Sequence, residues 1–289
     1  MRTICNIAKA ELQVLFFSPI AWLMLILFTF QVGLDFAGNL TNVFLAQDFP
    51  GGSVSNVSAS IFTAFDGGVF PYVLGYLYLY MPLLTMGLMS REYTSGSIKM
   101  LYSSPVSNGQ IVLGKFFSMM LFCLALNGIL LLYALLGVFV IENMDVWAVL
   151  TGILGIYLVS CTYAAIGLFM STLTSYQIVA ALGTLTVLGL LQWVGGVWQD
   201  VEFVRDVTYW ACISGRASEF IRGLICSEDL LYFVFVSAFF LALSVIYLNS
   251  KRRNVSRGML LGKYLLVFVG LVMLGYLSSR PKPSDRAQY

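Results

Sequence analysis

The chain has 289 residues, of which 59% are hydrophobic and only 10% are charged, and its formal net charge is +2. An ordinary soluble domain carries roughly 25% charged residues, so this composition excludes a soluble fold and predicts a membrane protein with several spans. The chain contains no histidine, which excludes HExxH proteases, histidine metal sites and Ser-His-Asp or Cys-His catalysis in this polypeptide.

Seven apolar stretches are long enough to cross the hydrocarbon core as helices, which requires about 20 residues each. Because backbone groups in lipid must bond within their own segment, we expect an all-α transmembrane bundle. The stretches are Leu15–Leu34, Phe70–Met89, Phe116–Ile141, Val146–Met170, Ile178–Trp198, Leu230–Leu248 and Met259–Leu277. Residues 1–250 would form a six-span domain, and residues 251–289 an extra span with a short tail.

The loop charges predict the orientation of the chain in the membrane. Basic residues gather before the first span and in the loops that follow spans two and six, whereas acidic residues dominate the opposite side. The positive-inside rule therefore places the N-terminus in the cytoplasm. Seven crossings would leave the tail, Ser278–Tyr289, outside, although its own Arg280, Lys282 and Arg286 favour the cytoplasmic side.

The segment ahead of the first span, residues 1–14, is predicted to be an amphipathic helix lying in the membrane interface. Its polar face would carry Arg2, Asn6, Lys9 and Gln13, opposite Ile4, Ile7, Ala8, Leu12 and Leu15. Glu11 falls within the apolar face. Its carboxylate either snorkels to water or is buried against a cytoplasmic loop and paired with Arg91.

The loop between the second and third spans, Ser90–Lys115, contains a short stretch with helical spacing. Residues 97–102 are predicted to form one or two turns that end before Pro105. Ile98, Leu101 and Tyr102 would share one face, at positions i, i+3 and i+4. Such an element suits either contact with a partner protein or an ordinary interhelical loop.

Few polar groups fall within the spans. Asn127, Gln192 and a stripe of tyrosines, Tyr72, Tyr76 and Tyr80, are uncharged. They suit interhelical hydrogen bonding and packing, with substrate contact as the alternative. Since no buried charge pair is visible, a proton- or sodium-coupled carrier is disfavoured.

The segment Gln199–Asp229, on the outer side in this topology, mixes charged and apolar residues at helical spacing and is expected to form short helices. Cys212 and Cys226 both fall in it. An oxidising exterior would permit a bridge between them, and two free thiols are the alternative.

Three blocks of sequence, in order, resemble permease subunits of type-2 ABC exporters, in particular the gliding-motility and copper-site-maturation branch. The blocks are Ala8–Leu12 with Phe16–Ile20; Pro82–Met86 with Glu92, Ser95–Ile98, Ser104–Ser107 and Ile111–Lys115; and Phe220–Ile225 with Asp229–Phe233. The middle block is the most specific. Two positions depart from the family pattern: Gly87 stands where an arginine is usual, and Ser97 where a threonine is usual.

The resemblance implies a permease subunit of an ATP-driven exporter in the inner membrane, with no catalysis of its own. Gly114-Lys115 is followed by Phe116, so the chain has no Walker phosphate loop, and ATP and Mg would bind to a separate ATPase subunit. Other implied partners are a second permease subunit, membrane lipids and an external-domain partner at the tail, and no nucleic acid is implied. The alternative is a non-transporting membrane scaffold that anchors an external domain or assembly.

The resemblance also implies two functional regions. The loop that couples to the ATPase would contain Glu92, Gly96, Ser97, Ile98, Leu101, Tyr102 and Pro105, close to Lys9 and Glu11 of the interfacial helix. An outer gate would contain Phe220, Arg222 and Gly223.

Overall fold

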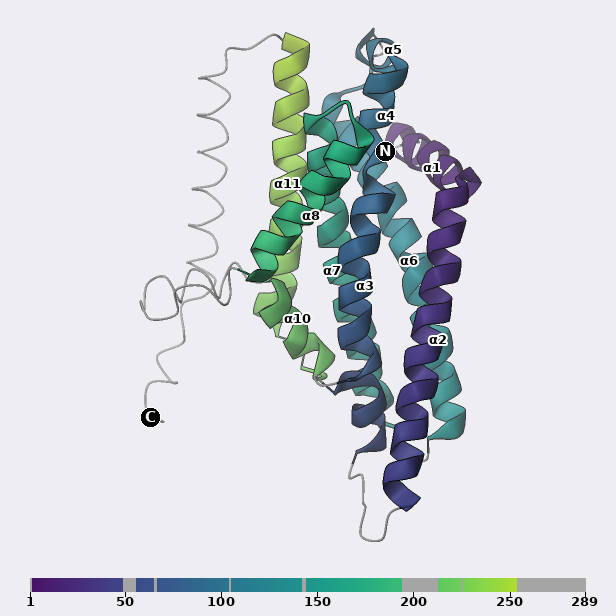
Figure 1. The fold of residues 1–289 in the computed structure, drawn as a ribbon. Helices are drawn as coiled ribbons and strands as arrows, with labels where there is room; N and C mark the ends of the chain where they lie inside the picture. The colour runs from purple at the N-terminus through teal and green to yellow at the C-terminus, as the bar shows by residue number, and fades with distance from the viewer. Residues whose placement is uncertain are drawn as a thin grey trace, which may run out of the picture.

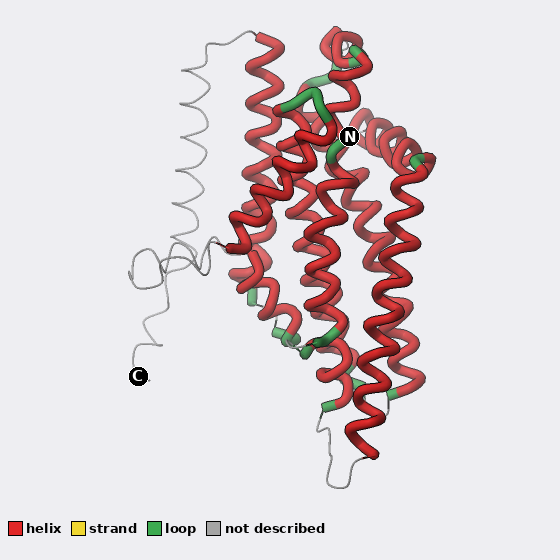
Figure 2. Tube along the Cα trace, in the orientation of Figure 1, coloured by secondary structure: helices red, strands yellow, loops and turns green. Residues whose placement is uncertain are grey.

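The computed structural model describes residues 2–48, 56–64, 67–103, 105–141, 144–193, 213–224 and 226–253. These residues form helices and no strand, which confirms the predicted all-α class (Figure 2). In chain order the helices are α1 (Arg2–Phe17), α2 (Pro19–Asp48), the π-helix η1 (Ala59–Thr63), α3 (Val69–Thr85), α4 (Gly87–Ser95), α5 (Ile98–Ser103), α6 (Asn108–Val140), α7 (Val146–Leu173), α8 (Gln177–Trp193), α10 (Ile213–Ile221) and α11 (Ser227–Arg253).

Five of these helices are long and apolar enough to cross a membrane, when α3 and α4 are taken together as one stretch. They are α2, α3 with α4, α6, α7 and α11, while α8 is a shorter apolar helix. Each coincides with one of the first six predicted spans, so the chain is a multi-pass membrane protein. The seventh predicted span, Met259–Leu277, and the tail behind it lie outside the described residues.

Helix α7 is the centre of the bundle, and it contacts α3, α6, α8, α10 and α11 (Figure 1). Three glycines allow these neighbours to approach closely, because a Cβ atom at Gly152, Gly155 or Gly167 would overlap Phe70, Phe220 or Thr85. Small residues at such crossings are typical of helix packing in membranes, where close van der Waals contact replaces the hydrophobic effect.

The first span differs from its predicted bounds, Leu15–Leu34. The chain turns at Ser18, and Pro19 begins α2 at a position where its missing N–H group removes no helical hydrogen bond. Helix α2 then continues to Asp48, well beyond the expected end of the span. The Asn39 side chain connects the second half of this helix to the next segment by donating a hydrogen bond to the Gly67 carbonyl at 2.6 Å.

Helix α6 begins at Asn108, eight positions before the predicted start of the third span at Phe116. Its start is fixed by a capping box: the Ser107 side chain accepts a hydrogen bond from the Gln110 N–H group, and the Gln110 side chain accepts one from the Ser107 N–H group. Lys115 therefore lies two turns inside a helix and not in a loop, contrary to the sequence-based expectation.

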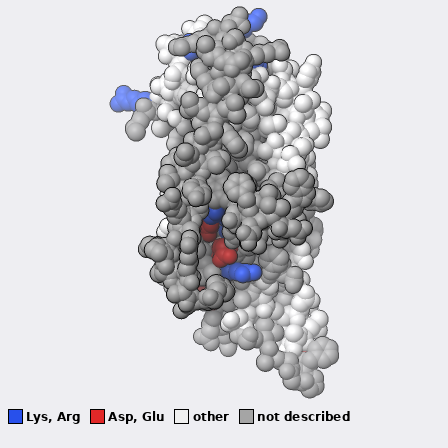
Figure 3. All heavy atoms as spheres, turned by 90° about the vertical axis from the view of Figure 1, so that its left-hand side faces the viewer, with Lys and Arg blue, Asp and Glu red and all other residues white. Residues whose placement is uncertain are grey.

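The surface matches a membrane bundle. On the side that Figure 3 shows, most described atoms belong to uncharged residues, with Lys and Arg at the upper end and a small group of charged side chains lower down. Large apolar side chains such as Phe30, Leu132 and Phe139 are exposed, which suits contact with lipid.

Candidate functional site

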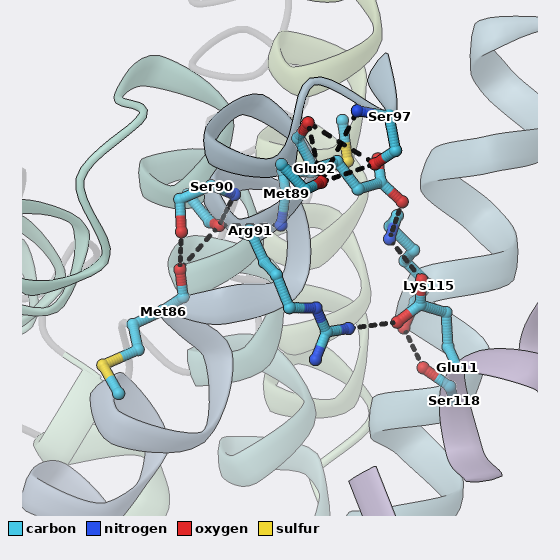
Figure 4. A network of polar contacts seen from close by, with 11 residues as sticks. Glu11, Met86, Met89, Ser90, Arg91, Glu92, Ser97, Lys115 and Ser118 are labelled. Atoms are coloured by element: carbon cyan, nitrogen blue, oxygen red, sulfur yellow. Dashed lines mark hydrogen bonds and ion pairs between the residues drawn. The ribbon is translucent and has the colours of Figure 1, made fainter. Parts of the chain in front are cut away.

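A cluster of four charged residues joins three helices at the end of the bundle that carries α1, α4 and α5. The Lys115 ammonium of α6 lies 2.5 Å from Glu11 Oε1 of α1 and 2.7 Å from Glu92 Oε1 of α4. Figure 4 shows the lysine between the two carboxylates. Its side chain is only 1% exposed, so a single buried cation links two carboxylates from different parts of the chain.

Gly114 brings α1 and α6 together at this point. A Cβ atom at Gly114 would lie 2.7 Å from Ile7 Cγ2 and 3.3 Å from the Ile4 carbonyl oxygen. Because only hydrogen stands there, α1 can lie directly on α6, and the next residue, Lys115, reaches Glu11. The Gly-Lys pair noted in the sequence thus has a physical role: the glycine makes room for the contact that the lysine forms.

Helix α1 has the two faces expected from its sequence. Arg2, Asn6, Lys9 and Gln13 are exposed, whereas Ile4, Ile7, Ala8, Leu12 and Leu15 are buried or partly buried. Glu11 does not snorkel to water. Its side chain is 13% exposed, and Glu11 Oε2 lies 3.4 Å from an Arg91 guanidinium nitrogen, so the expected pair with Arg91 is present.

Arg91 completes the cluster from its exposed side. Its side chain is 44% exposed, and an exposed ion pair of this kind contributes at most about 1 kcal/mol to stability. The second oxygen of Glu92, Oε2, is buried and forms no hydrogen bond. The cluster therefore holds two cations and two anions, but one carboxylate oxygen still lacks a partner.

Helix α4 begins at a break in the α3–α4 stretch. At this break the Ser171 side chain of α7 forms hydrogen bonds with backbone groups of the stretch. Ser171 Oγ accepts from the N–H groups of Met89 and Ser90 at 2.9 and 3.0 Å and donates to the Met86 carbonyl at 3.0 Å. A side chain inserted into the helical ladder is a recognised cause of a kink. Gly87, where the resembled family usually has an arginine, lies at this break, and no atom lies within 4 Å of the position that a Cβ would take there.

The predicted coupling element forms α5, which ends before Pro105 as expected. Gly96 connects it to α4 with a φ of +73°, a left-handed conformation that glycine adopts without steric strain. Ser97 Oγ lies 2.8 Å from Ser95 Oγ within this turn. Figure 1 shows α5 at the extreme end of the bundle.

The exposed face of α5 is not the one that the sequence suggested for docking. Ile98 and Leu101 pack against the core, and Tyr102 is partly buried. Met100 is 79% exposed, and Lys99 is exposed beside it. The amphipathic pattern is present, but its apolar face contacts the protein's own bundle, which leaves Met100 and Lys99 exposed.

The far end of α11 holds this region in place. Arg252 donates to the carbonyl oxygens of Tyr102 and Val106 at 2.9 and 3.3 Å. One turn earlier, Asn249 Oδ1 accepts from Asn108 Nδ2 at 2.8 Å. Helix α11 is therefore connected to the last turn of α5, to the loop behind it and to the first residue of α6.

At the opposite end of the bundle, α10 and α11 are joined by a buried ion pair. An Arg216 guanidinium nitrogen lies 2.6 Å from Asp229 Oδ1, with side chains 10% and 9% exposed. The guanidinium carbon lies 4.8 Å from the centre of the Tyr232 ring, within range of a cation–π interaction. This pair was not predicted from the sequence.

The predicted outer-gate residues lie around this pair but differ in environment. Phe220 is fully buried, packed between Gly155 of α7 and the Phe233 ring. Gly223 adopts a φ of +85° beside Ala148, and Arg222 is exposed. Within the segment that was expected to form short helices, residues 199–212 lie outside the described part, and α10 is the helix that is described.

The cysteine and polar-residue predictions have mixed outcomes. Cys226 is an exposed free thiol, while Cys212, its predicted bridge partner, lies outside the described residues. Asn127 was expected to form a hydrogen bond to another helix. Its side chain instead donates to the Cys123 carbonyl of its own helix at 2.8 Å. Gln192 does reach another helix, with Nε2 3.5 Å from the Tyr163 hydroxyl.

The described residues contain no group of three or more His, Cys, Asp or Glu side chains that could hold a metal ion. What the charged cluster provides is a connection between helices, because Lys115 of α6 contacts the carboxylates of both Glu11 in α1 and Glu92 in α4. A family model for the ABC-2 family transporter protein matches residues 5–201, well over half of the chain. The chain belongs to the ABC-2 transporter family. No curated protein matches it.

The chain is a transmembrane permease of the ABC-2 family, a class of membrane component that is not itself catalytic. The matched range contains all four residues of the charged cluster and the whole of α5. The ion pair between Arg216 and Asp229 lies beyond it.

The contacts of Lys115 were not predicted from the sequence, in which this residue was placed at the end of a loop. The signal was available in the capping box at Ser107 and Gln110, which marks the start of a helix. Once the helix begins there, Lys115 falls inside an apolar helical stretch, where a lysine without a partner would be unfavourable.

Proposed function

We propose that this ABC-2 permease is the membrane subunit of an ATP-driven exporter and that it works with a separate ATPase subunit. The observation that supports this most is the bridge formed by Lys115 between Glu11 and Glu92, next to the exposed α5. A coupling device needs an exposed contact and a firm connection to the spans. Met100 and Lys99 offer the contact, and the buried cluster offers the connection.

In this proposal the end of the bundle with α1 and α5 faces the cytoplasm. The positive-inside pattern supports this, since Arg2, Lys9, Lys99 and Arg252 lie at that end and are exposed. The amphipathic α1 would lie in the inner interface with its polar face toward water. The N-terminus would then be cytoplasmic.

ATP binding would close two ATPase subunits and push α5. Because α5 is continuous with α4 through Gly96, the push moves Glu92, and Lys115 carries the motion to α6 and α1. Ser171 sits at the point where α4 departs from α3 and also belongs to the core helix α7. The break at Met86 is therefore the natural hinge for this movement.

The opposite end would act as the outer gate. Helix α10 is short and packs on α7 through Phe220, and it is tied to α11 by the pair between Arg216 and Asp229. A rigid α10–α11 unit of this kind can move as one body when α7 and α11 shift.

Several parts of the assembly follow from the type-2 exporter interpretation. Two permease subunits would stand side by side, and ATP and Mg would bind to the ATPase subunits below them. The gliding-motility and copper-site-maturation branch remains the more specific proposal, since the three sequence blocks support it. In this chain a seventh span at Met259–Leu277, beyond the six of the family core, would carry the tail outside to an external-domain partner.

Purification of the tagged full-length chain from its native membranes tests the proposal. We expect a Walker-motif ATPase to co-purify, and we expect its ATP hydrolysis to depend on the permease. The control is the same purification of a Lys99→Glu, Met100→Asp double variant, which should insert normally but lose the ATPase. If no ATPase co-purifies and an external protein does, the chain is a membrane scaffold and the export proposal is wrong.

A further inference from the structure

Two antiparallel helices face each other with matched polar side chains inside the membrane-spanning part. The Tyr76 hydroxyl of α3 donates to Asp35 Oδ2 of α2 at 2.8 Å. One turn away, the Tyr80 hydroxyl donates to Gln31 Oε1. Gln31 and Asp35 are four residues apart, as are Tyr76 and Tyr80, so the two pairs form successive rungs of one polar track.

The track lies within the part of α2 that crosses the membrane. A helix rises 1.5 Å per residue, so Asp35 lies about 24 Å along the axis from Pro19, and Gln31 about 18 Å. The hydrocarbon core is about 30 Å thick, and both residues therefore fall within it when α2 starts at the interface. Helix α2 continues to Asp48 beyond them, so Asp35 does not belong to a loop.

A carboxylate at this depth requires an explanation. Asp35 is partly exposed at the surface of the chain. Within the described residues, no Lys or Arg forms an ion pair with it. Ionisable groups inside a membrane almost always face a water-filled cavity or a partner group and mark a pathway, because lipid solvates them poorly. The Tyr76 hydroxyl satisfies one oxygen but carries no charge.

The residues near Asp35 in the fold and in the sequence favour one class of ligand. Tyr72, one turn from Tyr76 on α3, is 47% exposed, and the ring faces of tyrosines attract cations. The stretch from Asp35 to Val69 contains no Lys or Arg and three aspartates, so no basic group of this stretch competes for the carboxylate. A negative charge with one exposed tyrosine a helical turn further along α3 suits an organic cation and repels an anion.

We propose that Asp35, Tyr76 and Tyr72 form a recognition site for a cationic group of the exported cargo. Asp35 supplies the charge, Tyr72 supplies an aromatic face, and the hydrogen bond from Tyr76 orients the carboxylate. Gln31 and Tyr80 extend the site by one rung toward the middle of the span. The role in cargo recognition rests on the proposed export function. Binding of a cation at this site, however, does not require an ATPase and can be tested without one.

Binding of two probes of the same shape and opposite charge tests the site. The purified full-length chain is placed in nanodiscs of phosphatidylcholine. Equilibrium dialysis then measures the binding of the cation tetraphenylphosphonium and of the anion tetraphenylborate. We expect saturable binding of the phosphonium cation, and no saturable binding of the borate anion. Asp35→Asn should weaken cation binding by about tenfold, whereas Asp35→Glu should keep it within about threefold.

Asp48→Asn is the matched control, because it removes a carboxylate from an exposed position at the end of the same helix. Its cation binding should equal that of the parent chain. Tyr76→Phe keeps the ring, removes the hydrogen bond and should weaken binding by about threefold, which provides a second test if Asp35→Asn fails to fold by size-exclusion chromatography. Unchanged cation binding in both variants, equal binding of the two probes, or an effect of Asp35→Asn on oligomeric state alone would overturn the site. An ATPase-free preparation gives the same readout, so failure of the export proposal is recognised separately.

Discussion

The Lys115 ammonium lies 2.7 Å from the Glu92 carboxylate and 2.5 Å from that of Glu11, although the three residues belong to α6, α4 and α1. Lys115 is almost fully buried, whereas each carboxylate keeps a small exposed fraction. The lysine is therefore the shared partner, and its loss leaves two anions facing each other.

Replacement of Lys115 by methionine should lower the stability of the fold strongly. Removal of one partner from a buried ion pair typically costs about 3–5 kcal/mol, because an uncompensated charge is left behind. The free energy of unfolding can be measured in mixed micelles by titration with SDS. Lys99→Met is the control, since Lys99 is exposed and should change the stability by less than about 0.5 kcal/mol. Equal effects of the two variants would show that the cluster does not hold the helices together.

Gly114→Ala should push α1 away from α6. The new methyl group would lie 2.7 Å from Ile7 Cγ2, and overpacking of this kind costs about 1–3 kcal/mol. Trimming the neighbour in the Ile7→Ala, Gly114→Ala double variant should recover part of the loss. Gly109→Ala, with no atom within 4 Å of its Cβ position, should leave stability unchanged or raise it. The contact is disproved if the double variant is no more stable than Gly114→Ala alone.

The sequence predicted the spans well and their ends less well, and the reason is physical. Hydropathy is a local property, so the apolar stretch that became α7 was placed at the correct first residue, Val146. The end of a helix depends on capping and on tertiary contacts. Helix α2 continues past Leu34 to Asp48. Its added length is supported by the hydrogen bond from the Asn39 side chain to the Gly67 carbonyl, between η1 and α3.

The charged cluster was only half predictable. The position of Glu11 on an apolar helical face indicated that it needed a partner, and Arg91 was named correctly. The contribution of Lys115 depends on the close approach at Gly114, which no periodicity reveals. The orientation of α5 was also beyond the sequence, because an apolar face can pack on its own protein or on a partner with the same pattern.

The second buried ion pair, at the other end of the bundle, gives an independent test of how α10 is held. Arg216→Met should destabilise the fold by about 3–5 kcal/mol, since Asp229 would stay buried without a partner. Changing both residues to apolar ones, in Arg216→Met, Asp229→Leu, should restore much of the loss. Arg222→Met, at an exposed position six residues away, should have little effect. If the double variant is as unstable as the single one, the pair is not the main connection.

The native cysteines can test the orientation. In a Cys212→Ser background, an impermeant maleimide should label Cys226 on intact cells, whereas Cys5 should react only after permeabilisation. Both thiols are exposed. Partial desolvation, together with the nearby carboxylates of Asp229, Glu219 and Glu228, raises the pKa of Cys226. Less thiolate is then present at neutral pH, so labelling of Cys226 should accelerate as the pH rises toward 9. Labelling of Cys5 on intact cells would show that the N-terminus lies outside and that the proposed orientation is wrong.

Cross-linking from α5 tests most directly whether this helix is the contact with the ATPase. A benzophenone amino acid is introduced at Met100, which is 79% exposed, or at Leu101, which packs against the core. Illumination of native membranes should join position 100 to a Walker-motif ATPase, with more adduct in the presence of ATP, while position 101 should react mainly within the chain itself. Co-purification of the ATPase without any adduct from position 100 would contradict the proposed coupling through α5.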